Sequence, residues 1–370
     1  MPYFIKDNRG GGAEVQAYLK AKHLAQKEGL EVIYLTSNPG DKPQEEFVEG
    51  IRVLRKLRMP FPLRNTFTIF REILRIKPCI IYTRMNWPAL LPIGIASKIT
   101  GARTLWFATE DATLHPWFNL RSLMDASKDY KKSKIKLIPL FINALIEDLF
   151  FNLGLRLMDE IYAQNETQKQ LLRKNFGRDA KIFKSIHEIP KTEPEKSPRP
   201  VILWAGSFGK RKRPEIFIEI ARRLPQYEFI MIGRIKESQK ELLKNAPPNL
   251  HYAGYVPFDE SEKFFERAWI YVNTSEKGRE GFPNTFIQAW KHKTAVVSMN
   301  ADPDGLLSEK GLGILTDDDL EKTVEAIRKL VEDENLRGNM TSRAYKYAME
   351  NHSPQTLDKL FNLDRCKTAE

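Results

Sequence analysis

A proline and a helix start follow a glycine-containing turn in the segment 280–290, which reads Glu-Gly-Phe-Pro-Asn-Thr-Phe-Ile-Gln-Ala-Trp. Pro283 is suited to a first helical position, where its missing N–H costs nothing. The backbone amides of Asn284 and Thr285 would then point at whatever lies before the helix. Because a helix N-terminus favours negative charge, this segment predicts a site for an anion such as a phosphate.

Two polar side chains flank this predicted anion site. Glu280 lies beside it and can accept hydrogen bonds from neutral hydroxyls, and the amide of Gln288 can both donate and accept. The segment therefore describes a pocket with a phosphate end and a hydroxyl-rich end, as a nucleotide-sugar requires. The alternative is an ordinary loop-to-helix junction.

Two more segments have the composition of phosphate loops. The basic segment 206–214 reads Gly-Ser-Phe-Gly-Lys-Arg-Lys-Arg-Pro and lies between a predicted strand and a predicted helix. A solvated basic loop is the alternative there. The segment 9–14, Arg-Gly-Gly-Gly-Ala-Glu, opens the first predicted helix. Its glycines allow a tight turn and a close approach of a ligand to the amides, although a glycine run is more often only a flexible turn.

These motifs together resemble the retaining GT-B glycosyltransferases of the family 4 type. That family carries two glutamates separated by seven residues, and here the first is Glu280 while Gln288 holds the second position. The resemblance implies that Glu280 acts on the donor sugar, that Lys212 binds the diphosphate and that Gln288 contacts the ribose. Ser207 stands where arginine is common, so that contact is absent or supplied by Lys210 or Arg211.

The resemblance also implies a wider set of site residues. The donor-binding residues that it implies are Gly11, Gly12, Gly206, Lys212, Tyr255, Val256, Gly281, Phe282, Asn284, Thr285 and Gln288. Glu14 matches the family's glycine-rich loop, and Gly254–Pro257 is expected to meet the base through its backbone, or else to be a simple turn. Asp111 is expected to face the reacting sugar beside Glu280, with Glu110 as the neighbour that could hold this role instead. An N-cap is the alternative for Asp111.

The order of elements predicts an α/β protein with parallel sheets and crossover helices. At 370 residues, two domains are the natural expectation. The fold expected is GT-B, two Rossmann-like domains facing across a cleft: residues 1–191 on the acceptor side, 192–352 binding the nucleotide-sugar, and 353–370 containing a helix that returns to the first domain. The expected strands are 31–36, 51–57, 79–82 (buried), 104–108, 161–164, 201–205, 228–233, 250–252, 270–273 and 295–298, and the clearest expected helices are 13–28, 215–223 and 354–363. The proline-containing segment 192–200 is expected to link the domains.

The start of the chain differs from this pattern. Relatives begin with a short apolar strand before the glycine-rich loop, but here the segment 1–6, Met-Pro-Tyr-Phe-Ile-Lys, reaches the glycines almost at once. Most of the first strand is therefore expected to be missing. Either the start lies too late or the sheet lacks a central strand.

Composition and charge define the expected partners. The formal net charge is +11, which favours acidic partners such as phosphorylated small molecules or anionic lipid, and no element resembles a nucleic-acid module. The two cysteines and six scattered histidines predict neither a disulfide framework nor a protein-built metal site, and no cofactor is expected. No signal segment or membrane span is expected, which favours a cytoplasmic location.

A basic segment precedes an apolar one in the first domain. Contact with an anionic membrane surface is a hypothesis for its lysines, with packing of the apolar part inside the domain as the alternative. The lysines concerned are Lys128, Lys131, Lys132, Lys134 and Lys136.

The leading interpretation is a metal-independent, retaining hexosyltransferase. It would move a sugar from a nucleotide-sugar donor to a glycan or lipid-linked acceptor in cell-surface polysaccharide synthesis. The alternatives are a non-catalytic nucleotide-sugar or glycan-binding partner and a GT-B sugar-nucleotide epimerase.

Overall fold

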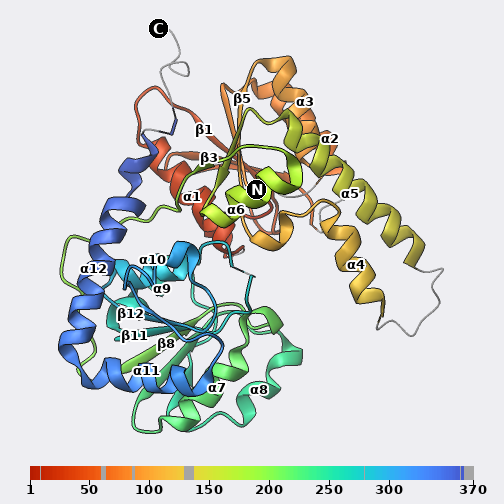
Figure 1. Cartoon of the computed structure of the whole chain (residues 1–370). Coiled ribbons are helices and arrows are strands. Elements are labelled where there is room, and N and C mark those ends of the chain that lie inside the picture. Colours follow the sequence, from red (N-terminus) through yellow and green to blue (C-terminus); the bar gives the residue numbers. More distant parts are fainter. Residues whose placement is uncertain are drawn as a thin grey trace. The chain divides into compact units, whose positions relative to one another are not determined.

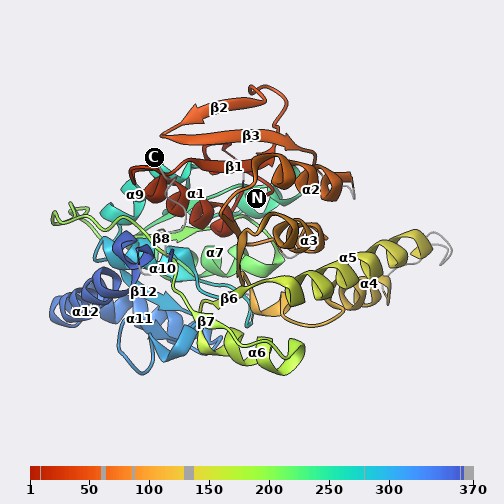
Figure 2. The same cartoon turned by 90° about the horizontal axis from the view of Figure 1, so that it is seen from above.

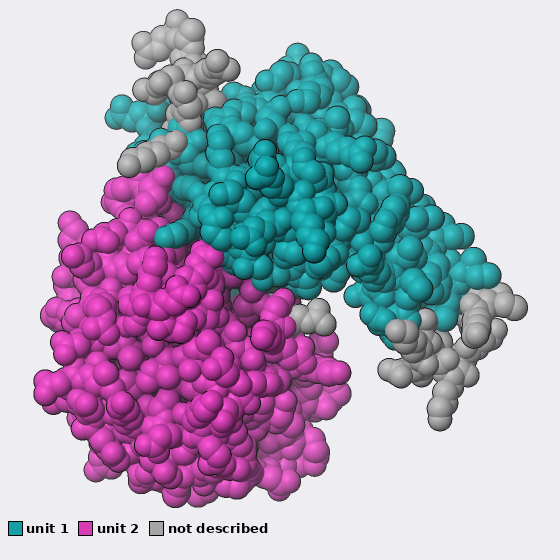
Figure 3. Space-filling view, viewed as in Figure 1, with its two compact units in different colours: residues 1–184, 357–370 teal, residues 185–356 magenta. Residues whose placement is uncertain are grey.

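A computed structural model of the chain describes residues 1–8, 10–59, 64–85, 88–128, 137–278, 280–358 and 360–361. It divides into two compact units, the first formed by residues 1–184 together with 357–370 and the second by residues 185–356 (Figure 3). Each unit is an α/β structure, and each is described here by itself.

The second unit is built on one six-stranded parallel sheet, with strand order β10-β9-β8-β11-β12-β13. Side chains of β8 alternate between the two faces, because Ile202 and Trp204 join one buried cluster while Leu203 and Ala205 join another. Both faces of this sheet are therefore covered. The strands are β8 (Val201–Ala205), β9 (Glu228–Ile232), β10 (Leu250–Tyr252), β11 (Ile270–Asn273), β12 (Ala295–Ser298) and β13 (Ile314–Leu315).

Helices cover the two faces of this sheet in two groups (Figure 1). Residues of α7, α11 and the start of α12 pack in the first cluster, and residues of α9, α10 and the end of α12 pack in the second. The helices are α7 (Pro214–Arg223), α8 (Glu241–Lys244), α9 (Phe258–Arg267), α10 (Asn284–Lys291), α11 (Leu320–Glu332) and α12 (Glu334–His352), with short 3-10 helices at Lys210–Lys212, Glu237–Gln239 and Pro303–Gly305.

The first unit has two separate sheets where a Rossmann-like domain has one. One sheet has the order β1-β3-β2, in which β1 and β3 are parallel and β2 is antiparallel, and the other is parallel with the order β4-β5-β6-β7. The strands are β1 (Val32–Ser37), β2 (Glu45–Val48), β3 (Ile51–Leu57), β4 (Ile80–Thr83), β5 (Arg103–Phe107), β6 (Glu160–Ala163) and β7 (Lys181–Ile182).

The position between β1 and β4 is the position of the expected first strand. Among the described residues no strand joins these two edges. The first residues instead run beside β1: the Met1 amino group donates to the Leu35 carbonyl at 2.9 Å, and the Pro2 carbonyl accepts from the Ser37 hydroxyl at 2.6 Å. Because β4 is an edge strand here, it is only half-buried, and the prediction of a buried strand at 79–82 was wrong.

Helices complete the first unit. They are α1 (Gly12–Ala25), α2 (Arg64–Ile76), α3 (Leu90–Thr100), α4 (Phe118–Lys128), α5 (Ile138–Leu157) and α6 (Glu166–Phe176), with 3-10 helices at Ile5–Asp7 and Asp111–Thr113. Figure 2 shows α4 and α5 side by side, extending away from the strands of this unit. After α12 the chain returns to the first unit, where Asp358 lies 3.1 Å from His23 of α1 and 3.0 Å from Lys27, which follows α1.

Two local predictions need correction. The helix expected over 354–363 is a 3-10 helix at Pro354–Leu357, and residues 359 and 362–370 lie outside the described residues. The second correction, at Pro283, is described with the candidate site. Residues 129–136 also lie outside the described residues, so membrane contact through Lys131, Lys132, Lys134 and Lys136 stays a prediction.

Candidate active site

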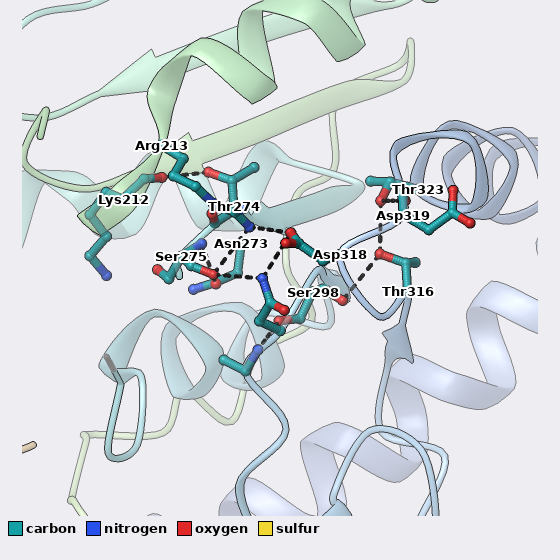
Figure 4. A network of polar contacts seen from close by, with 12 residues as sticks. Lys212, Arg213, Asn273, Thr274, Ser275, Ser298, Thr316, Asp318, Asp319 and Thr323 are labelled. Atoms are coloured by element: carbon teal, nitrogen blue, oxygen red, sulfur yellow. Dashed lines mark hydrogen bonds and ion pairs between the residues drawn. The ribbon is translucent and has the colours of Figure 1, made fainter. Parts of the chain in front are cut away.

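The loops that follow four parallel strands of the second unit meet at the carboxyl edge of its sheet (Figure 4). Arg213, before α7, connects two of them to its own loop: its Nε donates to the Thr274 carbonyl at 2.7 Å, and its guanidinium contacts Asp318 at 2.6 Å. Arg213 adopts a left-handed backbone, with φ of 46°, which turns the chain from the basic loop into α7. These contacts hold the chain directly after Lys212.

Lys212 and Glu280 form an ion pair at this edge. The Lys212 ammonium contacts the Glu280 carboxylate directly, and the Ser275 hydroxyl donates to the same carboxylate oxygen at 2.8 Å. The Lys212 carbonyl accepts from Thr274 at 2.6 Å, so both partners are anchored to the loop after β11. The structure thus brings together the two residues that were predicted to act on the diphosphate and on the sugar.

Glu280 is held in its charged form. Burial would raise the pKa of this carboxyl, but the neighbouring Lys212, the Ser275 hydroxyl and the positive charge of Arg211 outweigh burial and lower it. A carboxylate that stays ionised in a largely buried position can accept hydrogen bonds from sugar hydroxyls and stabilise positive charge nearby.

Helix α10 begins one residue later than the sequence suggested. Pro283 is the N-cap, with φ of −64° and ψ of 117°, and Asn284 is the first helical residue. The prediction of Pro283 at the first helical position was wrong by one residue, because its carbonyl already accepts the Phe286 amide at 3.0 Å while its own backbone stays extended. The amides of Asn284 and Thr285 remain in the first turn of α10, and the anion site at this helix start stays a prediction.

The backbone of Gly206, after β8, lies very close to that of Gly233, after the neighbouring strand β9. A Cβ atom on Gly233, the residue after β9, would lie 1.7 Å from the Gly206 carbonyl oxygen, so only glycine fits at position 233. Gly206 in turn lies against Trp204 and the aliphatic part of Lys212, which its own Cβ would meet at 3.4 and 3.6 Å. The close contact between Gly206 and Gly233 therefore holds the start of the basic loop against the loop after β9.

The residues expected near the base lie on the loop after β10. Tyr255 is exposed, and the Arg234 guanidinium stacks over its ring at 4.6 Å from the ring centre. Val256 packs against the buried cluster under α9 and α10. The structure therefore presents a flat cationic and aromatic surface at Tyr255, where the sequence suggested only backbone contacts.

Gln288 is held by α9 through its amide nitrogen. Its Nε2 donates to the Ser261 hydroxyl and to Glu262 Oε1, both at 3.1 Å. The other Glu262 oxygen contacts Lys291 and His292, each at 2.8 Å. A glutamate at position 288 would face the Glu262 carboxylate, so an amide fits this network better than the second carboxylate typical of the family.

Glu262→Gln tests the strength of this network. Burial raises the pKa of Glu262, but His292, Lys291 and His187 outweigh it and bring the pKa to about 2, from an ordinary value of 4.5. A depressed carboxyl pKa contributes stability that is present above pH 4.5 and lost as the pH falls toward 2. We therefore expect Glu262→Gln to lower the free energy of unfolding at pH 7 by about 3 kcal/mol, measured by urea unfolding.

The difference between wild type and Glu262→Gln should shrink at pH 3. Glu260→Gln, an exposed change in the same helix, is the matched control and should leave stability unchanged at both values of pH. Equal stability of Glu262→Gln and wild type at pH 7 would show that the network adds nothing.

The predicted site residues of the first unit lie at the start of α1 and in the segment after β5. Gly11 is the N-cap of α1, and its amide donates to the Glu14 carboxylate at 2.9 Å, so Glu14 stabilises the helix start. Gly12 is the first residue of that helix. Asp111 begins a 3-10 helix after β5, and its Oδ1 accepts from Gln168 at 3.1 Å. Glu110, and not Asp111, occupies the N-cap position, so the capping alternative does not explain Asp111.

Three residues near the candidate site in the second unit were not identified by the sequence analysis. Ser275 and Glu262 match no motif that the sequence analysis considered, and Glu262 meets its partner Gln288 only in the folded unit. Gly233 is the last residue of the strand predicted over 228–233 and could have been recognised there, because an isolated glycine at a strand end often marks a close backbone approach.

A two-unit α/β chain whose parallel strands end at a basic loop, a buried carboxylate and a helix start belongs to the GT-B fold class. Solved structures support this: the Anabaena protein HepE, in complex with UDP and glucose, is 17% identical, covers 95% of each chain and has a TM-score of 0.70. Residues 199–333 match the family model of the glycosyl transferases group 1.

Curated relatives agree with this family. An uncharacterized glycosyltransferase, MJ1069 of Methanocaldococcus jannaschii, is 23% identical over 92% of this chain and 91% of its own. The O-antigen biosynthesis glycosyltransferase WbnH of Escherichia coli is 22% identical over 53% of this chain and 58% of its own.

Proposed function

We propose that the protein is a retaining glycosyltransferase that moves a sugar from a nucleotide-sugar donor to a glycan or lipid-linked acceptor. The observation that carries this proposal is the Lys212–Glu280 pair in front of helix α10. Lys212 provides a cation for a diphosphate, and Glu280 provides a largely buried carboxylate for a sugar. The two side chains are in direct contact with each other.

Donor binding would separate the functions of the two partners. The diphosphate competes with Glu280 for Lys212 and for the amides of the α10 start, because phosphate oxygens are strong acceptors. Glu280, still held by Ser275, is then available to sugar hydroxyls and to the anomeric carbon as positive charge develops there.

The transfer step needs no protein nucleophile in this proposal. The bond between the anomeric carbon and the diphosphate oxygen breaks, and the acceptor hydroxyl oxygen bonds to that carbon on the same face. The acceptor proton passes to the leaving diphosphate. Lys212 and the helix start stabilise the negative charge that builds on the diphosphate, and fixed groups of this kind typically contribute about 3 kcal/mol without a metal ion.

Further residues complete the proposed donor site. Gly206, Gly281 and Phe282 would line the diphosphate and sugar, Gln288 would contact the ribose through its carbonyl oxygen, and the loop at Tyr255 and Val256 would meet the base. Gly11 and Gly12 of the first unit would bind the donor, and Asp111 of the same unit would face the reacting sugar. These roles stay predictions.

The relatives support the class of acceptor. WbnH is named for O-antigen biosynthesis, and HepE was solved with UDP and glucose. We infer a role in cell-surface polysaccharide synthesis on the cytoplasmic side, with UDP-sugars as the first donors to test.

A thermal-shift panel of nucleoside diphosphates and their sugars tests donor binding. A ligand present at about a hundred times its dissociation constant should stabilise the protein by about 2.7 kcal/mol. We expect one base series to raise the melting temperature and the others to leave it unchanged. No shift with any nucleoside diphosphate would contradict the proposed site.

A further inference from the structure

The carboxylate of Glu262 lies next to Gln288, the residue proposed to contact the ribose. Gln288 lies one helical turn after Asn284, the first residue of α10, and the two residues lie on the same side of that helix. Glu262 belongs to the neighbouring helix α9, and its Oε1 accepts from Gln288 Nε2 at 3.1 Å. The chain therefore carries a carboxylate beside position 288, although position 288 itself is an amide.

The hydrogen bonds around Gln288 determine which end of its amide faces α9. The Ser261 hydroxyl donates its proton to the Phe258 carbonyl at 2.6 Å, so its oxygen is left to accept from Gln288 Nε2 at 3.1 Å. Glu262 offers the same nitrogen a second acceptor. A reversed amide would place its carbonyl oxygen against these two acceptors, with no proton between them. The amide nitrogen therefore faces α9, and the carbonyl oxygen is on the side away from it.

Glu262 is itself held in place by two side chains of α10. Its Oε2 contacts Lys291 Nζ and His292 Nε2, each at 2.8 Å, and Lys291 also donates to the Glu188 carbonyl at 3.2 Å. Burial alone would raise the pKa of this carboxyl, but these neighbours bring it to about 2. An ionised carboxylate can only accept hydrogen bonds, so Glu262 always selects the nitrogen end of the Gln288 amide near neutral pH.

Gln288 keeps its carbonyl oxygen available to a ligand. Among the described residues, the hydrogen bonds of this side chain run through Nε2, and none reaches the carbonyl oxygen. The residue is only 5% exposed, so the oxygen has a fixed direction. A carbonyl oxygen needs a partner that donates a proton, which a ribose hydroxyl can do and an ionised phosphate cannot.

We propose that Glu262 is a positioning residue, which orients the Gln288 amide so that its carbonyl oxygen accepts from a ribose hydroxyl of the nucleotide-sugar. Glu262 itself does not touch the ribose. The inference rests on the proposed function, because it needs a nucleotide in front of α10. The carboxylate that the family resemblance places at position 288 would thus act here from α9, through an amide.

Calorimetry of the full chain with paired nucleotides tests the proposal. UDP, GDP, ADP and dTDP are each compared with analogues that lack a 2′ or a 3′ hydroxyl. For the nucleotide that binds wild type, loss of the hydroxyl that meets Gln288 should weaken binding about fivefold, the value of one neutral hydrogen bond. Glu262→Ala should bind the complete nucleotide about fivefold more weakly, and no better than the analogue. A purely structural loss would weaken both ligands equally and keep their ratio.

Two further variants keep the test informative if Glu262→Ala does not fold. Ser261→Ala keeps every charge but removes one of the two acceptors of Gln288 Nε2, so it should reduce the preference for the complete nucleotide. The exchange Glu262→Gln/Gln288→Glu returns the carboxylate to position 288, where Lys291 and His292 lie three and four residues further along α10. The exchange should restore the preference, because a glutamate there can accept from the ribose directly.

A matched control and three results decide the outcome. Glu260→Ala removes an exposed carboxylate of the same helix and should keep the wild-type ratio of affinities. Equal binding of the complete nucleotide and both analogues to wild type would overturn the inference and leave the proposed function standing. A wild-type ratio in both Glu262→Ala and Ser261→Ala would reduce Glu262 to a structural residue. A folded wild type that binds none of the four diphosphates would contradict the proposed function and this inference with it.

Discussion

Glu280→Gln should lower turnover with the natural donor and acceptor by about a hundredfold to a thousandfold, the usual effect of losing one transition-state contact. The amide keeps the shape of the side chain and can still accept from Ser275, but it no longer stabilises positive charge at the anomeric carbon. Nucleoside diphosphate should bind as tightly as in wild type or more tightly, because Lys212 loses its competing carboxylate. Steady-state kinetics and calorimetry measure the two effects separately.

A control separates chemistry from local disturbance in the Glu280 test. Glu276→Gln changes another carboxylate on the loop after β11 and should keep near-normal turnover. Near-normal turnover of Glu280→Gln with its natural acceptor would show that this carboxylate does not act on the sugar.

Lys212→Ala should weaken nucleoside diphosphate binding by about 1.5–3 kcal/mol, the value of a charged hydrogen bond. Turnover should fall further, because the charge on the leaving diphosphate grows in the transition state. Calorimetry with the diphosphate measures the first effect. Lys210→Ala, an exposed change on the same loop, should cost less.

The double variant Lys212→Ala/Glu280→Gln decides how Lys212 acts. If its ammonium contacts phosphate, the loss of affinity persists when the Glu280 charge is also removed. If Lys212 only neutralises Glu280, the double variant regains wild-type affinity. Regained affinity would contradict the assignment of Lys212 to the diphosphate.

Predictions from periodicity and turn residues succeeded in the second unit. The strands at 201–205, 250–252 and 270–273 have the predicted bounds, because each is a short apolar run between turn residues. β2, β7 and β13 were not predicted, since they are two or four residues long and mostly half-exposed. Their pairing depends on neighbouring strands and leaves little trace in local composition.

Contacts between segments that are distant in the chain could not be predicted from the sequence. Lys212 and Glu280 were each recognised, but their direct pairing depends on how the loops after β8 and β11 meet. Glu262 was missed because a glutamate on an amphipathic helix resembles any solvated one, and only the fold places it against Gln288 and His292. The exposed apolar side chains of α5, such as Ile142 and Leu149, were likewise indistinguishable from a core face, because the sequence does not show which side of a helix has a neighbour.

The most direct test of the proposed function is proton NMR of wild type incubated with the nucleotide-sugar that the thermal-shift panel selects. We expect free nucleoside diphosphate to appear together with a sugar that first carries the donor's anomeric configuration, in the acceptor product or, more slowly, in water. Glu280→Gln should release far less. A folded wild type that releases no nucleoside diphosphate from any stabilising donor, or that converts the donor into another sugar nucleotide, would contradict the assignment as a retaining glycosyltransferase.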